Sequence, residues 1–407
     1  MARGENMKER IRTLTSVCLA FAFIGVPFFA GDATAKGKPG PDPAPTEPTG
    51  DFASSSDPQA LMATGGYARV YTWVDGEFNH GWSGITDYNT WTVNVIGDID
   101  NDGYNEVLTA GSHSTTTGTG KNKVTTTTRT WFLWQDGDAS DSASLSFDPG
   151  FVPGFMEIGD ANNDGYNELV MAGTTVRVWS WNGNGFDEDA KILNVGSGGL
   201  TIADADNDDG NEILVGMARN SDGTSSGAAV MKYANGAYSV VARLGPTSGC
   251  PIDDVSVGDL DGDGNNELFG SGYNGARVAS KIFIWKYSAD SGGYSEIWNG
   301  DETEGEFHQS NEIADINGDG VNEIAFGELN NKHLVIYKYD GDNLWSLLGK
   351  YDNCAASNMD QLFSGDFDGD GTYSLLAADQ VWDWTGSAME ITQDLISGGS
   401  SSGVSLA

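Results

Sequence analysis

The sequence predicts an all-β fold, a seven-bladed β-propeller of four-stranded antiparallel blades, and two repeats support this prediction. One repeat, a pair of large apolar residues at i and i+2 before a turn, occurs seven times. Repeating units spaced 44–62 residues apart indicate a solenoid or a propeller, and a closed ring of blades leaves few sheet edges exposed. The other repeat is a nine-residue acidic segment found six times, at 98–106, 160–168, 204–212, 259–267, 315–323 and 366–374.

Short apolar runs on either side of each acidic segment predict the two inner strands of a blade. TVNVIGD precedes the first segment and EVLTAG follows it, and similar runs surround the others. Runs of four to six residues rich in Val, Ile and Leu, and bounded by Gly and Asp, are typical of buried strands. An EF-hand is excluded, because its bidentate Glu stands at position 12 between two helices, whereas here Glu stands at position 9 between strands.

The large apolar pairs predict the two outer strands. The spacing i, i+2 puts both side chains on one face of a strand, where we expect them to pack between blades. Hairpin turns such as Asp75-Gly76, Asn182-Gly183, Asn235-Gly236 and Asp340-Gly341 follow several pairs. The pairs are Tyr71/Trp73, Phe132/Trp134, Trp179/Trp181, Met231/Tyr233, Trp285/Tyr287, Tyr337/Tyr339 and Trp382/Trp384.

Each acidic segment has the composition of a calcium ligand set. Oxygen-bearing side chains stand at positions 1, 3 and 5, Gly usually follows at 6, and Glu usually ends the segment at 9. Such side chains converge on one centre because Gly permits the sharp turn, and a hard cation takes six to eight oxygens. Asp209 replaces Gly in the third segment and Ser374 replaces Glu in the sixth, so both are expected to bind more weakly. The expected ligands of up to six calcium ions are Asp98, Asp100, Asp102, Glu106, Asp160, Asn162, Asp164, Glu168, Asp204, Asp206, Asp208, Glu212, Asp259, Asp261, Asp263, Glu267, Asp315, Asn317, Asp319, Glu323, Asp366, Asp368 and Asp370.

These units resemble the FG-GAP/VCBS repeats that build the seven-bladed propeller of integrin α-subunits and of many secreted prokaryotic proteins. The resemblance covers residues 51–407. It implies that each nine-residue loop joins the two innermost strands of a blade and holds calcium on one face of the disc. It does not by itself imply adhesion, because function belongs to sites placed on folds.

The two ends of the repeat region predict how the ring closes. The stretch before Asp51 contains prolines, which do not fit an innermost strand, so the first blade lacks that strand. The tail, GGSSSGVSLA, resembles the approach to the third acidic segment, GSGGLTIAD. We therefore expect residues 402–407 to complete the first blade, with Val404 and Leu406 buried beside residues 59–64. The alternative is a disordered Gly/Ser tail.

The N-terminal 50 residues are expected to lie outside the fold. Residues 1–35 have the pattern of a signal peptide, with Lys8, Arg10 and Arg12 before the apolar stretch 13–30 and an A-x-A site at 33–35. An uncleaved membrane anchor is the alternative. Residues 36–50 form a Pro-rich linker. After cleavage only Cys250 and Cys354 remain, and the sequence leaves open whether they pair.

Charge and missing motifs narrow the function. A net charge of −38 argues against nucleic acid and anionic lipid as partners. Four scattered histidines, and no nucleophile elbow, phosphate loop, CxxC or HExxH motif, favour a protein that is not an enzyme. We expect a secreted or cell-surface module that binds an extracellular protein or polysaccharide, with the Thr-rich insertion 111–130 as candidate contact surface. The alternative is a polysaccharide-degrading enzyme, since some propellers of the family that this chain resembles, including rhamnogalacturonan lyases, are enzymes.

Overall fold

The computed structural model describes residues 19–20, 59–64, 67–85, 91–135, 143–148, 150–151, 153–173, 175–193, 195, 198–216, 227–245, 252–273, 280–302, 308–328, 333–352, 362–368, 371–377, 380–395 and 403–406. Cys250, Cys354 and Asp370 lie outside these residues, as do the expected signal peptide and linker apart from Leu19–Ala20. The expectations for those segments therefore stay predictions.

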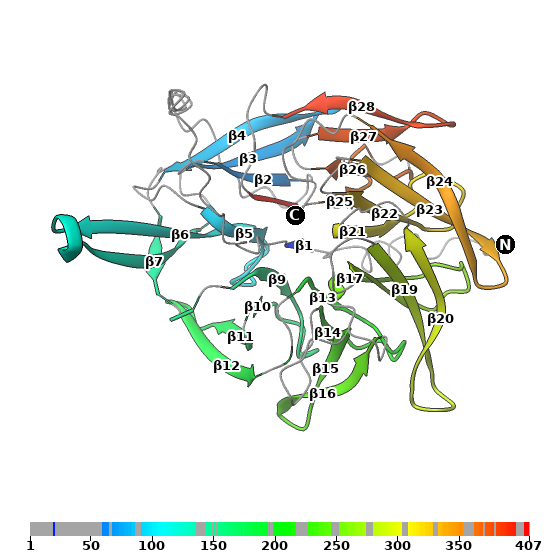
Figure 1. Cartoon of the computed structure of the whole chain (residues 1–407), viewed down its shortest axis with the longest axis horizontal. Coiled ribbons are helices and arrows are strands. Elements are labelled where there is room, and N and C mark those ends of the chain that lie inside the picture. The colour runs from blue at the N-terminus through cyan, green and yellow to red at the C-terminus, as the bar shows by residue number, and fades with distance from the viewer. Residues whose placement is uncertain are drawn as a thin grey trace, which may run out of the picture.

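The all-β, seven-bladed prediction is confirmed: seven antiparallel sheets are arranged around a central axis (Figure 1). From the centre outward, the first sheet contains β1 (Leu19–Ala20), β29 (Gly403–Leu406), β2 (Gln59–Thr64), β3 (Tyr67–Val74) and β4 (Glu77–Ile85). The second to fourth sheets contain β5 (Trp91–Gly97), β6 (Glu106–Thr117), β7 (Val124–Trp134) and β8 (Leu145–Phe147); β9 (Phe155–Gly159), β10 (Glu168–Ala172), β11 (Thr175–Trp181) and β12 (Phe186–Leu193); and β13 (Leu200–Ala203), β14 (Glu212–Val215), β15 (Ala228–Ala234) and β16 (Ala237–Leu244). The last three contain β17 (Ile252–Gly258), β18 (Glu267–Tyr273), β19 (Ser280–Ser288) and β20 (Gly293–Glu302); β21 (His308–Ala314), β22 (Glu323–Glu328), β23 (His333–Gly341) and β24 (Leu344–Tyr351); and β25 (Leu362–Gly365), β26 (Ser374–Ala377), β27 (Gln380–Trp384) and β28 (Met389–Asp394).

The first blade combines strands from both ends of the chain. β29 pairs antiparallel with β2, with Ala60 opposite Leu406 and Ala63 opposite Gly403. The C-terminal strand therefore lies beside the strand that the sequence assigned to it. It is not the innermost strand, because the two residues of β1 pair with its other edge. That this pairing seals and stabilises the ring stays a prediction.

Two of the expected hairpin turns form between outer strands as predicted, but the Asp340-Gly341 prediction is wrong: Gly341 ends β23 and pairs with Leu344, so the turn falls on Asp342-Asn343. Asp75-Gly76 and Asn235-Gly236 both have positive φ at each residue (56° and 92°; 55° and 81°), which is the geometry of a type I′ turn between twisted strands. Large aromatic rings pack between neighbouring blades, as the pair Trp82 and Trp134 shows, with ring centroids 5.5 Å apart in an edge-to-face arrangement.

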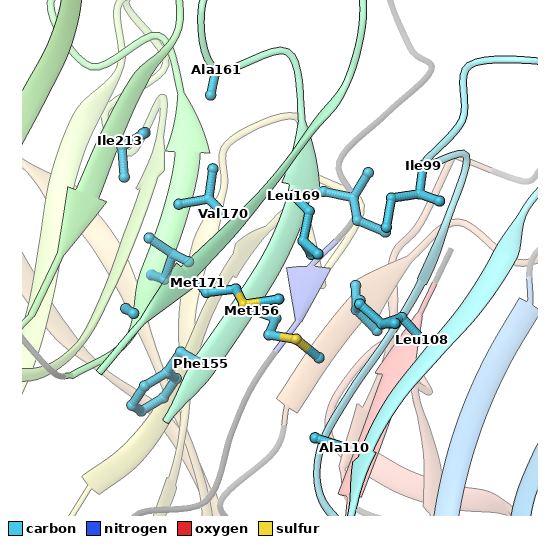
Figure 2. Close-up of a cluster of buried hydrophobic side chains, with 14 of the residues drawn as sticks. Ile99, Leu108, Ala110, Phe155, Met156, Ala161, Leu169, Val170, Met171 and Ile213 are labelled. Carbon is cyan, nitrogen blue, oxygen red and sulfur yellow. The ribbon is translucent and has the colours of Figure 1, made fainter. Parts of the chain in front are cut away.

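The acidic segments are anchored in the core between blades. Figure 2 shows Ile99 and Ala161, the second residues of two segments, among buried side chains such as Leu108, Met156 and Leu169. The second residue of every segment is apolar and at most 5% exposed. Burial of this side chain fixes the start of each loop against the blade. These residues are Ile99, Ala161, Ala205, Leu260, Ile316 and Phe367.

The Thr-rich insertion is a hairpin rather than an irregular loop. β6 and β7 continue past the disc and pair as far as Thr117 and Val124, with the short 3-10 turn η1 (Gly120–Asn122) at the tip. Figure 1 shows this ribbon projecting from the rim of the propeller. In the part of the chain that the structure describes, no helix has the length and apolarity of a transmembrane span.

Candidate metal centres

All six acidic segments lie at equivalent places, between the innermost pair of long strands in six blades. Each runs from the end of one strand to the start of the next: β5 to β6, β9 to β10, β13 to β14, β17 to β18, β21 to β22 and β25 to β26. In each, the residue before position 1 pairs with the residue at position 9, as Gly97 does with Glu106. The strand register therefore closes the ends of every loop in the same way.

Backbone amides hold the first carboxylate of each loop. In the first loop, Asp98 accepts hydrogen bonds from the amides of Asp102 (3.1 Å) and Gly103 (3.1 Å). The same two bonds recur at Asp160, Asp204, Asp259 and Asp315. Position 6 must take positive φ to make this turn; Gly103 does so at 94°, and Asp209 does so at 68° in the third loop. Asp209 is therefore compatible with the loop fold.

The Glu at position 9 is buried, and one of its two carboxylate oxygens accepts hydrogen bonds from the loop backbone. One oxygen of Glu106 accepts hydrogen bonds from the amides of Ile99 (2.9 Å) and Asp100 (3.3 Å). Equivalent bonds hold Glu168, Glu212, Glu267 and Glu323. Burial raises the pKa of Glu106 to about 8, since its charge has been moved away from water. The five loops differ in what meets the second oxygen of this Glu.

In the first loop the second oxygen has no hydrogen-bond partner. Glu106 Oε1 and Asp100 Oδ1 are both buried and unpartnered. Ligand oxygens of Asp98, Asp100 and Glu106 lie within 4.8 Å of one another. Buried carboxylate oxygens without partners are costly unless a cation compensates them. This loop therefore fits a divalent cation, which Asp98, Asp100 and Glu106 would hold.

In the second and fifth loops a side-chain amide donates a hydrogen bond to the second oxygen of the position-9 Glu. Asn162 Nδ2 donates to Glu168 Oε1 at 2.8 Å and to Asp164 Oδ2 at 3.1 Å. Asn317 Nδ2 likewise donates to Glu323 Oε1. These amides donate where a metal ligand would have to accept, so metal binding here requires the amide to turn its oxygen inward.

In the third and fourth loops a lysine ammonium lies among the expected ligands. Lys232 Nζ lies 2.8 Å from Asp206, 2.7 Å from Asp208 and 2.7 Å from Glu212. In the fourth loop Lys286 lies 2.9, 2.7 and 2.6 Å from Asp261, Asp263 and Glu267. Lys286 lowers the pKa of Asp263 to about 2. Sequence reasoning missed both lysines, although each stands between the members of an aromatic or apolar pair.

The sixth loop is the least complete. Asp366 keeps the bond from the amide of Gly371, at 3.1 Å, and its other oxygen is buried without a hydrogen-bond partner. Ser374 begins β26 at position 9, so no carboxylate caps the start of this loop. Asp370 lies outside the described residues.

Asparagines link each of the first four loops to the loop of the next blade. The amide of Asn167 donates to Asn101 Oδ1 at 2.5 Å, while Asn167 Nδ2 donates to the carbonyl of Asp98 at 2.7 Å. The same exchange joins the second loop to the third through Asn163 and Asn211, and the third to the fourth through Asn207 and Asn266. Asn322 then bonds to the carbonyl of Asp259 at 2.8 Å. We refer to this series as the asparagine belt.

Three other buried carboxylates link the innermost strands. Glu157 of β9 accepts from the amide of Ile202 in β13 at 3.0 Å, and Asp254 of β17 accepts from the amide of Asn311 in β21 at 2.8 Å. Glu312 of β21 accepts from Ser364 Oγ in β25 at 2.9 Å. Burial raises the pKa of Glu312 to about 8 and that of Glu157 and Asp254 well above the usual range. One oxygen of each has no hydrogen-bond partner.

Comparison with known proteins supports the repeat and the fold. Residues 315–377, from the fifth acidic loop to the end of β26, match the FG-GAP-like repeat. A protein of Lactobacillus plantarum of known structure is 11% identical, with a TM-score of 0.59 over 86% of this chain and 99% of that one. The periplasmic gluconolactonase of Pseudomonas aeruginosa is also 11% identical, with a TM-score of 0.50 over 86% of this chain and 98% of the other. The search of curated proteins finds no match.

The expectation that the chain is not an enzyme is corrected by this comparison. It depended on four scattered histidines and on the lack of familiar catalytic motifs. The structure places these histidines in three sheets, with His308 of β21 and His333 of β23 in the same one. A gluconolactonase has the same fold, so neither observation excludes enzymatic activity. Because the identity is 11%, the likeness shows the fold alone and gives this chain no reaction.

Proposed function

Because the chain is a seven-bladed propeller that carries an FG-GAP-like repeat, we propose that it is a secreted, calcium-binding recognition module. Calcium supports the inner hairpins of the blades in this proposal, and an extracellular protein or polysaccharide binds elsewhere on the propeller. The observation that carries the proposal is the recurrence of one carboxylate arrangement in blade after blade. Its clearest instance is the first loop, with two unpartnered buried oxygens.

Calcium is the cation that best suits these loops. Their donors are carboxylate, amide and backbone oxygens, the ligands that hard cations prefer, and no Cys or His lies in any of them. The loops are Asp-rich turns that offer several side-chain oxygens each. Mg²⁺ demands near-ideal octahedral geometry and keeps several waters, whereas Ca²⁺ accepts irregular sets of six to eight oxygens.

Thermal melting tests the metal assignment. A cation that binds only the folded chain raises its stability by mass action, so the melting temperature should rise with Ca²⁺ and fall with a chelator. Asp100→Asn should remove most of the calcium contribution of the first loop, whereas Asp187→Asn, on the exposed strand β12, should leave it unchanged. If calcium and chelator leave the melting temperature of the wild-type protein equal, the assignment is wrong.

The projecting β6–β7 hairpin is the surface that we propose for recognition. Side chains 114–129 are exposed, and beyond Gly111 and Trp131 no third strand pairs with the ribbon in the described chain. Its free edges can accept an extended segment of a partner, since unpaired strand edges are templates for added strands. Lys121, Lys123 and Arg129 gather positive charge here on a chain of net charge −38, which favours an acidic partner.

Glycan and protein arrays probed with the calcium-loaded protein test recognition. Binding to an acidic polysaccharide or protein, and its loss when Lys121, Lys123 and Arg129 are replaced by Glu, would support this surface. A screen for polysaccharide cleavage and lactone hydrolysis belongs beside the arrays. Turnover of a substrate without any stable binding partner would replace recognition by catalysis as the function.

A further inference from the structure

The loops differ in a way that bears on how many of them need a metal. This inference deepens the proposed calcium binding and rests on it. In the first loop the second oxygen of the position-9 Glu has no hydrogen-bond partner, whereas in the third and fourth loops it contacts a lysine ammonium at 2.7 and 2.6 Å. The three loops share the hydrogen bond from the position-5 amide to the position-1 Asp, and all three have Asp at positions 1, 3 and 5.

The position of each lysine is set by strand pairing. Lys286 of β19 stands directly opposite Glu267 in the ladder between β18 and β19. Lys232 follows Met231, the partner of Ile213, and thus occupies the same place beside Glu212. In the second blade Gln135 follows Trp134, the partner of Val107, so the equivalent place beside the first loop holds a neutral side chain.

An ammonium group fits between the three carboxylates. Lysine has three N–H donors, and each ammonium lies within 2.6–2.9 Å of three carboxylate oxygens, from positions 3, 5 and 9. These are the side chains that the sequence assigns to the metal, and Ca²⁺ would sit 2.3–2.6 Å from such oxygens. Lysine and metal therefore compete for one position, because two cations cannot share it.

We propose that Lys232 and Lys286 are tethered cations that take the place of calcium in the third and fourth loops. These two blades are then held without metal, and calcium binds the remaining loops, the first above all. The lysines also keep the two loops folded at calcium concentrations that empty the others. Replacing either lysine by an apolar residue should convert its loop into a calcium site.

The sixth blade, which contains the fifth loop, offers a matched control. Lys338 follows Tyr337, the partner of Ile324, and so has the same place in its ladder as Lys232 and Lys286. Its ammonium bonds instead to Asp340 outside the loop, at 3.0 Å, while Asn317 donates to Glu323 within it. Replacing Lys338 therefore removes the same charge without opening a metal position.

The experiment counts the calcium ions bound by the full chain, using native mass spectrometry and equilibrium dialysis. The variants are Lys232→Met, Lys286→Met, the double variant and Lys338→Met. We expect each single variant of the proposed pair to bind one more calcium ion than wild type, the double variant two more, and Lys338→Met none. In chelator the double variant should melt below wild type, and calcium should raise its melting temperature by more than it raises that of wild type.

The outcomes separate this inference from the proposed function. If wild type binds calcium and the double variant binds no more, the lysines do not hold the metal positions and the inference fails alone. Wild type that already binds six ions also overturns it, because both lysines would then be displaced. If no variant binds calcium, the proposed function fails together with it.

Discussion

Replacing Glu312 by Gln should stabilise the propeller at alkaline pH. Glu312 is 4% exposed in β21, where Ser364 Oγ donates to one of its oxygens at 2.9 Å and the other has no hydrogen-bond partner. Burial raises its pKa from 4.5 to about 8. A Gln side chain of the same shape keeps the acceptor for Ser364 and removes the charge that is costly to bury.

The sign of the effect follows from proton linkage. The folded chain holds the Glu312 proton more tightly than the unfolded chain, so this group favours folding most below pH 4.5 and loses that contribution as pH rises to about 8. A pKa difference of about 3.5, at about 1.4 kcal/mol for each pKa unit, sets an upper limit of about 5 kcal/mol. Glu312→Gln should therefore gain stability over wild type between pH 5 and pH 9, by up to this amount.

Urea unfolding of calcium-loaded protein at several pH values measures this difference directly. Saturating calcium keeps the loop carboxylates ionised, so their titration does not obscure that of Glu312. Glu390→Gln, on the exposed part of β28, is the matched control for loss of one charge. A stability difference between Glu312→Gln and wild type that stays constant from pH 5 to pH 9 would refute the reasoning.

Three further changes test other parts of the fold. Removing residues 403–407 deletes β29 and exposes an edge of β2, so melting should occur at lower temperature or with aggregation; an unchanged melting curve would exclude ring closure by the tail. Replacing 114–127 by an Asn-Gly turn should leave the melting temperature unchanged and abolish array binding, and persistent binding would place recognition elsewhere. Asn211→Ala breaks its 2.9 Å bond to the Asp160 carbonyl and should cost about 1 kcal/mol in urea unfolding, unless the belt is dispensable.

Much of the fold could be predicted because its signals are local. Apolar runs beside Gly and Asp gave the inner strands, and Asp75-Gly76 and Asn235-Gly236 form the turns expected of them. One outer pair was predicted two residues out of register, because Phe132/Trp134 appeared equivalent to Trp179/Trp181. Val107 and Leu169 each follow the Glu of their segment, and they pair with Trp134 and Trp179 respectively. Trp134, rather than Phe132, is therefore the equivalent of Trp179. Register depends on contacts along the whole ladder, so a two-residue shift keeps the same alternation and escapes pattern analysis.

The differences between the metal loops required the structure. Lys286 lies about one strand and one connection away from Asp261 in sequence, and only the pairing of β18 with β19 brings its ammonium to the loop. The asparagine belt was visible as Asn at position 8 in five segments, yet its partners lie 48–69 residues earlier, in the previous blade. A recurring residue whose partner belongs to the neighbouring repeat has no signature within its own repeat.

The asparagine belt has a consequence for how such a ring can change over evolutionary time. Asn at position 4 of one repeat and Asn at position 8 of the next form the three joints from the first loop to the fourth, so a repeat with both asparagines brings one half of the joint on each side. A duplicated or deleted repeat would leave the new neighbours already matched at this edge. At the first blade, where no acidic segment precedes β2, Asn105 bonds instead to the side chain of Gln59 at 3.1 Å. The number of blades can thus change by gene duplication without any change in the belt asparagines. The number of blades in the ring is then determined by how side chains pack between neighbouring blades.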